Sequence, residues 1–171
     1  MTDIEKYQSE LDKLIAEDAT AIFGNYTQDH AVCIFRTFIR NAKHSILLLT
    51  GDFAQGIFLM PDIRSALLSA IQRGVTLRVI SLNPGTQEEM ERFRTLIVPS
   101  SAGSYDYVIG RVREGVTVHH YLVVDGKAYR YEAPHQEMHP MQVHAEVCCN
   151  GVEGASVLAR RFESLWLRLH V

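Results

Sequence analysis

Residues 45–81 read SILLLTGDFAQGIFLMPDIRSALLSAIQRGVTLRVIS, and this stretch decides the fold class. The run His44–Thr50 is continuously apolar after its first residues, which is typical of a strand buried on both faces. Pro61 and Asp62 suit the first turn of a helix that Gly74 ends. The run Val75–Ser81 predicts a second strand. A strand, a helix and a strand in this order are typical of an α/β protein.

Two amphipathic helices are predicted ahead of this stretch. Thr2 and Glu5 have the spacing of a capping box, and the apolar residues after them predict a first helix that ends before Gly24. A second helix begins near Thr27 and buries one apolar stripe, made of Ala31, Ile34, Phe35, Phe38, Ile39 and Ala42.

The second half of the chain predicts one short helix, four strands and a closing helix. Thr86 and Glu89 again have capping-box spacing, which predicts a charged helix through Arg94. Asp125-Gly126 predicts a hairpin turn. The expected strands are Tyr105–Ile109, Thr117–Val124, Lys127–Tyr131 and Val143–Cys149, and the closing helix is Ala155–Leu169.

This order of elements predicts an α/β fold with a mixed β-sheet and helices on both faces. Residues 1–26 are expected to form an N-terminal helical extension, and residues 27–171 one compact domain. The 171 residues are 47% hydrophobic, which is ordinary for a single globular domain.

The composition limits which cell compartment and which binding partners we expect. Three cysteines without a CxxC pair favour a reducing compartment, and adjacent Cys148 and Cys149 are not expected to join each other. No secretory signal opens the chain and no apolar run is long enough to span a bilayer, so we expect a cytoplasmic protein without membrane contact. The net charge of −3 does not indicate nucleic acid, whose binding would need a local basic site.

The ordered motifs resemble those of phospholipase D-like domains. SILLLTGDF followed by IRSALLSAIQRGVTLRVIS is similar to the opening unit of that superfamily, with Arg73-Gly74-Val75 before its second strand. The segment VHHYLVVDGKAYRYEA resembles the signature hairpin H-x-K-x4-D, and LARRFESLW resembles the closing helix. The resemblance implies a single phospholipase D-like half from about residue 27 onward.

The resemblance also implies that the catalytic motif is degenerate. With Asp125 as the matching aspartate, the position of the nucleophilic histidine falls on Val118 and that of the phosphate-binding lysine on His120. The glycine and serine positions fall on Glu132 and Ala133, and the later asparagine position on His135. Valine has neither a lone pair nor a charge, so the mechanism of the superfamily is not expected here.

The hairpin holds the candidate site residues His119, His120, Arg130 and Glu132. Histidine suits proton transfer near neutrality, so His120 is a candidate catalytic residue. Two ordinary strand histidines, one facing the core and one facing solvent, are the simpler explanation of the pair. A two-residue Asp-Gly turn would place Glu132 opposite His119 and Arg130 opposite Tyr121, unless a bulge changes the register.

Arg130 and Glu132 share one face of a strand, because one residue separates them. The guanidinium of Arg130 suits a phosphate or carboxylate, and Glu132 could orient it or act as a base. A solvated ion pair is the other explanation. His135, with the two strand histidines, completes the predicted ligand-binding set, and Asp52 at the end of the first buried strand could also line a pocket.

No metal site is predicted from the remaining histidines. His135, His139 and His144 lie near Glu137, but Pro134 and Pro140 disfavour the framework that zinc requires. No phosphate-binding glycine loop or other cofactor motif occurs, so no cofactor is expected.

Two functions are compatible with these residues. The first is a non-catalytic homodimeric module that binds a phosphate- or nucleotide-type ligand for sensing or regulation. The second is a divergent phosphodiesterase or nuclease that uses His120 with Glu132 or His135. A homodimer is expected because active sites of the superfamily contain two motif copies and this chain carries one.

Overall fold

The computed structural model describes residues 1–112, 119–133 and 144–169. Within these ranges, strands β1 to β7 form one mixed sheet in the order β1-β7-β6-β5-β2-β3-β4. The strands are β1 (Ile22–Asn25), β2 (Ser45–Thr50), β3 (Thr76–Ser81), β4 (Ser104–Ile109), β5 (His120–Val124), β6 (Ala128–Glu132) and β7 (Ala145–Cys148). The predicted α/β class with a mixed sheet is confirmed.

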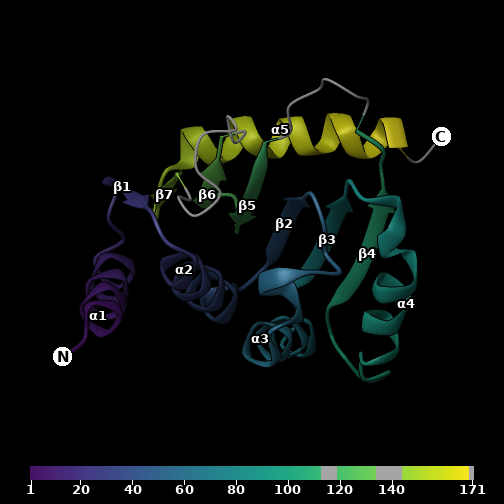
Figure 1. The fold of residues 1–171 in the computed structure, drawn as a ribbon, viewed down its shortest axis with the longest axis horizontal. Helices are drawn as coiled ribbons and strands as arrows, with labels where there is room; N and C mark the ends of the chain where they lie inside the picture. The colour runs from purple at the N-terminus through teal and green to yellow at the C-terminus, as the bar shows by residue number, and fades with distance from the viewer. Residues whose placement is uncertain (113–118, 134–143, 170–171) are drawn as a thin grey trace.

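The helices cover both faces of the sheet, as predicted. They are α1 (Asp3–Ala16), α2 (Gln28–Asn41), α3 (Pro61–Gln72), α4 (Gln87–Thr95) and α5 (Val152–Leu169), with short 3-10 turns η1 (Gly56–Leu59) and η2 (Pro84–Thr86). Figure 1 shows α5 along one face and α1 to α4 on the other. No helix in the described part of the chain has the length and apolar character needed to cross a membrane.

The central strands are buried on both faces, which explains their continuous apolar sequence. β2 and β3 pair in parallel, so Leu48 lies beside Val79 and Leu49 beside Ile80. Leu48 and Val79 belong to the larger core under α1 to α4, whereas Leu49 and Ile80 belong to the smaller core under α5. Neighbouring residues on each strand therefore serve different cores.

Side-chain caps account for the starts of α1 and α2. The Thr2–Glu5 capping box is present, and the Thr27 hydroxyl accepts a hydrogen bond from His30 N at the start of α2. The capping box predicted at Thr86 is wrong, because Thr86 has helical backbone angles and its hydroxyl donates to the Ser81 hydroxyl and the Asn83 carbonyl. Thr86 thus satisfies buried polar groups at the end of β3.

The segment before residue 27 contains a strand that the sequence did not reveal. β1 pairs antiparallel with β7, from Ile22 opposite Cys148 to Asn25 opposite Ala145. Leu11 of α1 is also buried in the larger core. Residues 1–26 therefore contribute both the predicted helix and an edge strand of the sheet.

The adjacent cysteines lie in different cores, so they do not join each other, as predicted. Cys148 packs in the core under α5 and Cys149 in the core under α1 to α4. Burial raises the pKa of Cys149 to about 11, so its thiol stays protonated at neutral pH.

The β5–β6 hairpin has a different register from the predicted one. His120 lies opposite Glu132, Tyr121 opposite Tyr131 and Leu122 opposite Arg130. Asp125 and Gly126 form the centre of the turn, both with positive φ, and Lys127 is an extra residue before Ala128 pairs with Val124. This bulge shifts every pair by one residue, so the predicted His119–Glu132 pair is wrong.

The Asp125 carboxylate ties this turn to the start of β2. Its Oδ2 accepts a hydrogen bond from Lys43 N (2.9 Å), and its Oδ1 accepts from His44 N (2.7 Å) and Ser45 N (2.9 Å). One side chain therefore satisfies three backbone donors that precede the central strand.

Asp125→Ala should lower the free energy of unfolding by about 2 kcal/mol, because three donors lose a charged acceptor. Asp125→Asn should cost less, since asparagine tolerates a positive φ and keeps one acceptor oxygen. Urea denaturation measures both. Glu10→Ala on the exposed face of α1 is the control, and an equal loss in Glu10→Ala and Asp125→Ala would contradict the assigned role.

Candidate ligand site

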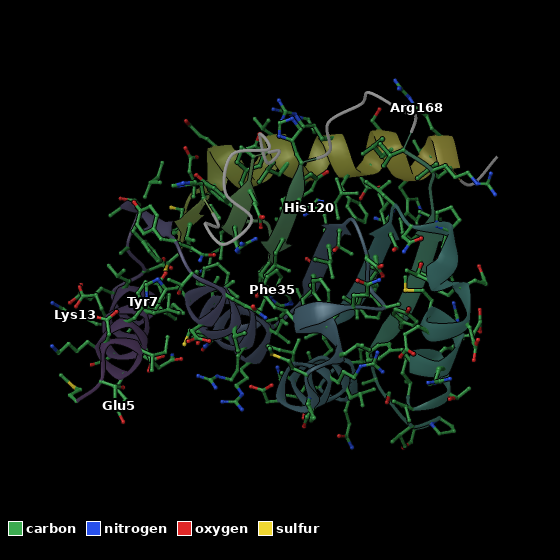
Figure 2. All side chains as sticks on the ribbon, in the orientation of Figure 1. Glu5, Tyr7, Lys13, Phe35, His120 and Arg168 are labelled. Atoms are coloured by element: carbon green, nitrogen blue, oxygen red, sulfur yellow. The ribbon has the colours of Figure 1, made fainter. Side chains whose placement is uncertain are left out.

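A cavity of about 580 Å³ lies beside the carboxyl end of β2, between the sheet and α2. This is the edge of the sheet where α/β proteins commonly bind ligands. Figure 2 labels two of its lining residues, His120 on β5 and Phe35 on α2. The polar residues that line it are Thr27, Gln28, Asp29, Thr50, Asp52, Gln55, His120, Tyr121, Arg130 and Glu132.

Arg130 and Glu132 form a buried ion pair at the cavity wall. Arg130 is only 3% exposed, and its Nη2 donates to Glu132 Oε2 at 2.7 Å while its Nε donates to Asn25 Oδ1 at 2.8 Å. The guanidinium also lies 5.2 Å from the centre of the Phe35 ring. Burial lowers the pKa of Arg130, and Glu132 opposes that shift. The Nε and Nη2 donors of Arg130, which was expected to bind an anion, therefore already form hydrogen bonds within the protein.

His120 lies over the backbone of Gly51, at the point where β2 ends. A Cβ added to Gly51 would approach His120 Nε2 to 3.0 Å and Cε1 to 3.2 Å, which is closer than most Cβ contacts. The imidazole is half-buried and lines the cavity. Glycine at position 51 therefore permits this placement of the His120 side chain.

His119 is not among the residues that line this cavity. Its Nδ1 shares a hydrogen bond with the Tyr131 hydroxyl, and the two rings lie 5.4 Å apart. Tyr131 packs against the core under α5, on the other face of the sheet. Of the predicted ligand-binding set, the structure brings together His120, Arg130 and Glu132, whereas His135 falls outside the described residues, as does Val118.

Asp52 lines the same cavity with both carboxylate oxygens engaged. Its Oδ1 accepts a hydrogen bond from Ala54 N (2.7 Å), and its Oδ2 accepts one from Asn83 Nδ2 (2.6 Å). The second bond joins the loop after β2 to the loop after β3. These donors compensate part of the negative charge that Asp52 brings to the cavity.

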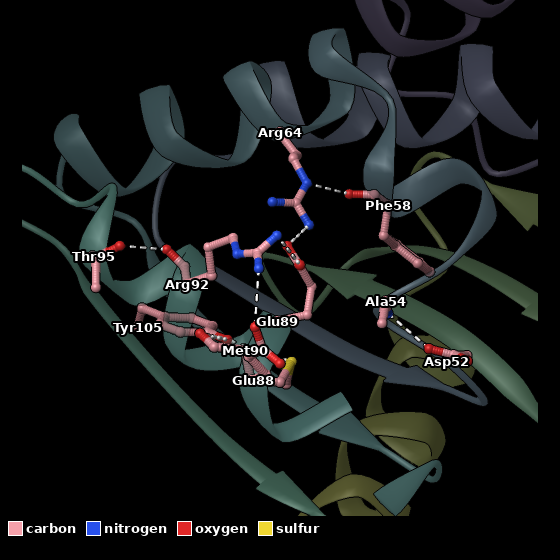
Figure 3. A network of polar contacts seen from close by, with 10 residues as sticks. All are labelled: Asp52, Ala54, Phe58, Arg64, Glu88, Glu89, Met90, Arg92, Thr95 and Tyr105. Carbon is pink, nitrogen blue, oxygen red and sulfur yellow. Dashed lines mark hydrogen bonds and ion pairs between the residues drawn. The ribbon is translucent and has the colours of Figure 1, made fainter. Parts of the chain in front are cut away.

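The loop after β2 is anchored to α3 and α4 from its outer side (Figure 3). Arg64 Nε donates to the Phe58 carbonyl at 2.9 Å, and Arg64 Nη2 pairs with Glu89 of α4. Asp52, Gln55, Ile57 and Phe58 of this loop line the cavity, so the Arg64 contacts help to fix its shape.

The first turn of α2 is a part of the site that sequence reasoning missed. Thr27, Gln28 and Asp29 line the cavity, so the positive end of the α2 dipole contributes to its field. The Thr27 capping signal was visible in the sequence, but no local pattern indicated that this helix end lies beside the hairpin.

Comparison with known proteins identifies the fold. Neither the known protein-family models nor the curated proteins gave a match. Among solved structures, Nuc from Salmonella typhimurium, a phospholipase D family member, is 18% identical with a TM-score of 0.61, over 85% of this chain and 93% of that chain. NucT from Helicobacter pylori is 13% identical with a TM-score of 0.56, over 84% of this chain and 95% of that chain. The chain has a phospholipase D-like fold.

A longer protein also has a similar fold over part of its chain. TrmBL2, an archaeal chromatin protein, is 11% identical with a TM-score of 0.67, and the match covers 96% of this chain but 60% of that chain. At these identities the likeness concerns the fold, and function must be argued from the site.

Arg130→Met should destabilise the protein by about 3–5 kcal/mol, because Glu132 would keep a buried charge without its partner. The double variant Arg130→Met/Glu132→Leu should lose much less than the sum of the single variants. A urea-denaturation double-mutant cycle measures this coupling. The exposed pair Arg92–Glu88 is the control, for which the coupling should stay below about 0.5 kcal/mol. Additive losses at Arg130 and Glu132 would overturn the prediction.

Proposed function

We propose that this chain is a non-catalytic module that binds a small anionic ligand, of the phosphate or nucleotide type, in the cavity beside β2. The observation that carries the proposal is the convergence of His120, Arg130 and the first turn of α2 on one cavity of about 580 Å³. A volume of this size is within the usual range for small-ligand sites.

Three features supply positive potential to this cavity. Arg130 contributes a charge that is balanced by Glu132, the α2 N-terminus contributes a partial charge, and His120 contributes a full charge when protonated. Asp52 and Asp29 oppose them, although the Asp52 oxygens already accept two hydrogen bonds. We therefore expect a positive charge on His120 to favour the binding of an anion.

Catalysis is the second candidate, and the hairpin argues against it. By the resemblance, the nucleophilic histidine is replaced by Val118 and the phosphate-binding lysine by His120. Glu132, the base considered for an alternative mechanism, accepts a hydrogen bond from buried Arg130. The matching aspartate, Asp125, accepts three backbone hydrogen bonds at the hairpin turn. A binding role requires none of the missing groups.

The ligand should bind more tightly at pH 6 than at pH 8, because histidine gains a proton near pH 6.5 in water. Calorimetric titration with inorganic phosphate and AMP measures this. His120→Gln should remove the pH dependence, and Gly51→Ala should weaken binding because its Cβ displaces the imidazole. His44→Gln, an exposed histidine on another part of the chain, is the control.

Equal binding by wild type, His120→Gln and Gly51→Ala would contradict the proposed site, as would no binding by wild type at either pH. The same proteins should not hydrolyse bis-p-nitrophenyl phosphate above background. Hydrolysis that His120→Gln abolishes, in a protein that stays folded, would favour the phosphodiesterase.

We further propose that the module is a homodimer with a sensing or regulatory role. A two-fold axis would bring two hairpins together, in the way that the motif pairs of the superfamily imply. Light scattering should therefore give about twice the chain mass of 19.3 kDa. A mass equal to one chain at all concentrations would exclude the dimer without affecting the ligand-binding prediction.

A further inference from the structure

The outer face of α5 carries a set of arginines without acidic partners. Arg160, Arg161 and Arg168 are exposed, and none of them forms a hydrogen bond or ion pair within the described part of the chain. Arg161 and Arg168 are seven residues apart, so they lie on one side of the helix about 10 Å from each other. Figure 2 shows Arg168 on the outer side of α5. We call these three residues the α5 basic face.

The acidic residues of α5 do not neutralise this face. Glu163 is held by Arg78 through two hydrogen bonds of 2.5 and 3.0 Å, and Glu153 lies in the first turn of the helix. The helix dipole explains a basic residue in the last turn, such as Arg168, but not Arg160 and Arg161 in the middle. Arg111, which is exposed and follows Gly110 beside Leu169, adds a further charge near the end of α5.

An aromatic depression lies on the same side of the sheet. Its volume is about 430 Å³, and Tyr26, Tyr131 and His144 line it. Tyr26 is 57% exposed, and its ring meets that of His144 edge-on at 5.9 Å. Tyr131 packs against the core under α5, which places the depression on the side of α5.

Arg161 is the arginine of the α5 basic face that lies near the hairpin strands, whereas Arg168 lies toward the other end of α5 (Figure 2). Tyr131 lies opposite Tyr121 in the hairpin. Burial raises the pKa of Tyr121, and Arg161 is near enough to oppose that shift. Glu146 also lines the depression, so negatively charged groups of a partner are expected over α5 and not over Glu146.

We propose that the α5 basic face binds the phosphate backbone of a single-stranded nucleic acid, and that the depression at Tyr26 and Tyr131 stacks its bases. Arginine binds phosphate with paired donors, and aromatic side chains bind bases through their ring faces. A membrane surface could use Val152, Val157 and Leu167, which are also exposed on α5, but it would leave the aromatic depression without a role. The cavity beside β2 receives no residue from α5, so this proposal goes beyond the ligand site.

The test is fluorescence anisotropy with a labelled 20-nucleotide single strand, titrated between 50 and 200 mM NaCl. The variant Arg160→Gln/Arg161→Gln/Arg168→Gln should bind more weakly, and the slope of log affinity against log salt should fall by about 2, since each single-strand phosphate contact contributes about 0.7. Tyr26→Ala should weaken binding about fivefold or more. Circular dichroism melting should show that both variants remain folded.

The matched control is Lys6→Gln/Lys13→Gln/Arg40→Gln, which removes three exposed positive charges from α1 and α2. Figure 2 labels Lys13 on α1, far from α5. This control should retain wild-type affinity and salt slope. The proposal is overturned if the wild-type protein does not bind the single strand, or if the two triple variants lose affinity equally. It is also overturned by tighter binding to the duplex of the same sequence, or if the α5 arginines are needed only for binding to phosphatidylserine vesicles.

Discussion

The buried guanidinium of Arg130 is the constraint on which the cavity beside β2 and the strands around it depend. A cation that is 3% exposed must be paired and hydrogen-bonded, and its partners come from the same strand and from the sheet edge. Glu132 supplies the charge, Asn25 supplies a carbonyl oxygen, and Phe35 supplies a ring face. Through these contacts one side chain joins β6, β1 and α2, three elements that are distant in sequence.

The same ion pair forms part of the wall of the cavity beside β2. Arg130 and Glu132 both line it, and their hydrogen bond fixes the position of each side chain. The strand register places His120 opposite Glu132, and the lack of a Cβ on Gly51 leaves room for the imidazole. Hydrogen bonds and close backbone approach therefore shape this part of the cavity wall.

The sequence predicts more of the fold than of the candidate site. β2 and β3 were predictable because both of their faces are buried, which makes their sequences continuously apolar. β1 (Ile22–Asn25) was not, because four residues that include a glycine and an asparagine carry no strand pattern, and only pairing with β7 makes them a strand. Long segments with a clear apolar pattern therefore make most of the fold predictable. The edge strand is not predictable in this way, because it depends on tertiary contacts.

Three of the predicted ligand-binding residues line the cavity, but the sequence did not predict how they pair across the hairpin. One bulge residue, Lys127, moves Glu132 from the predicted His119 to His120, and no sequence rule distinguishes that turn from a tighter one with the same Asp-Gly centre. Arg130 and Glu132 share one face of β6 in either register, because one residue separates them. The observed register changes the neighbour of the buried pair, because Glu132 lies opposite His120 and not opposite His119. The histidine beside the ion pair is therefore one that lines the cavity.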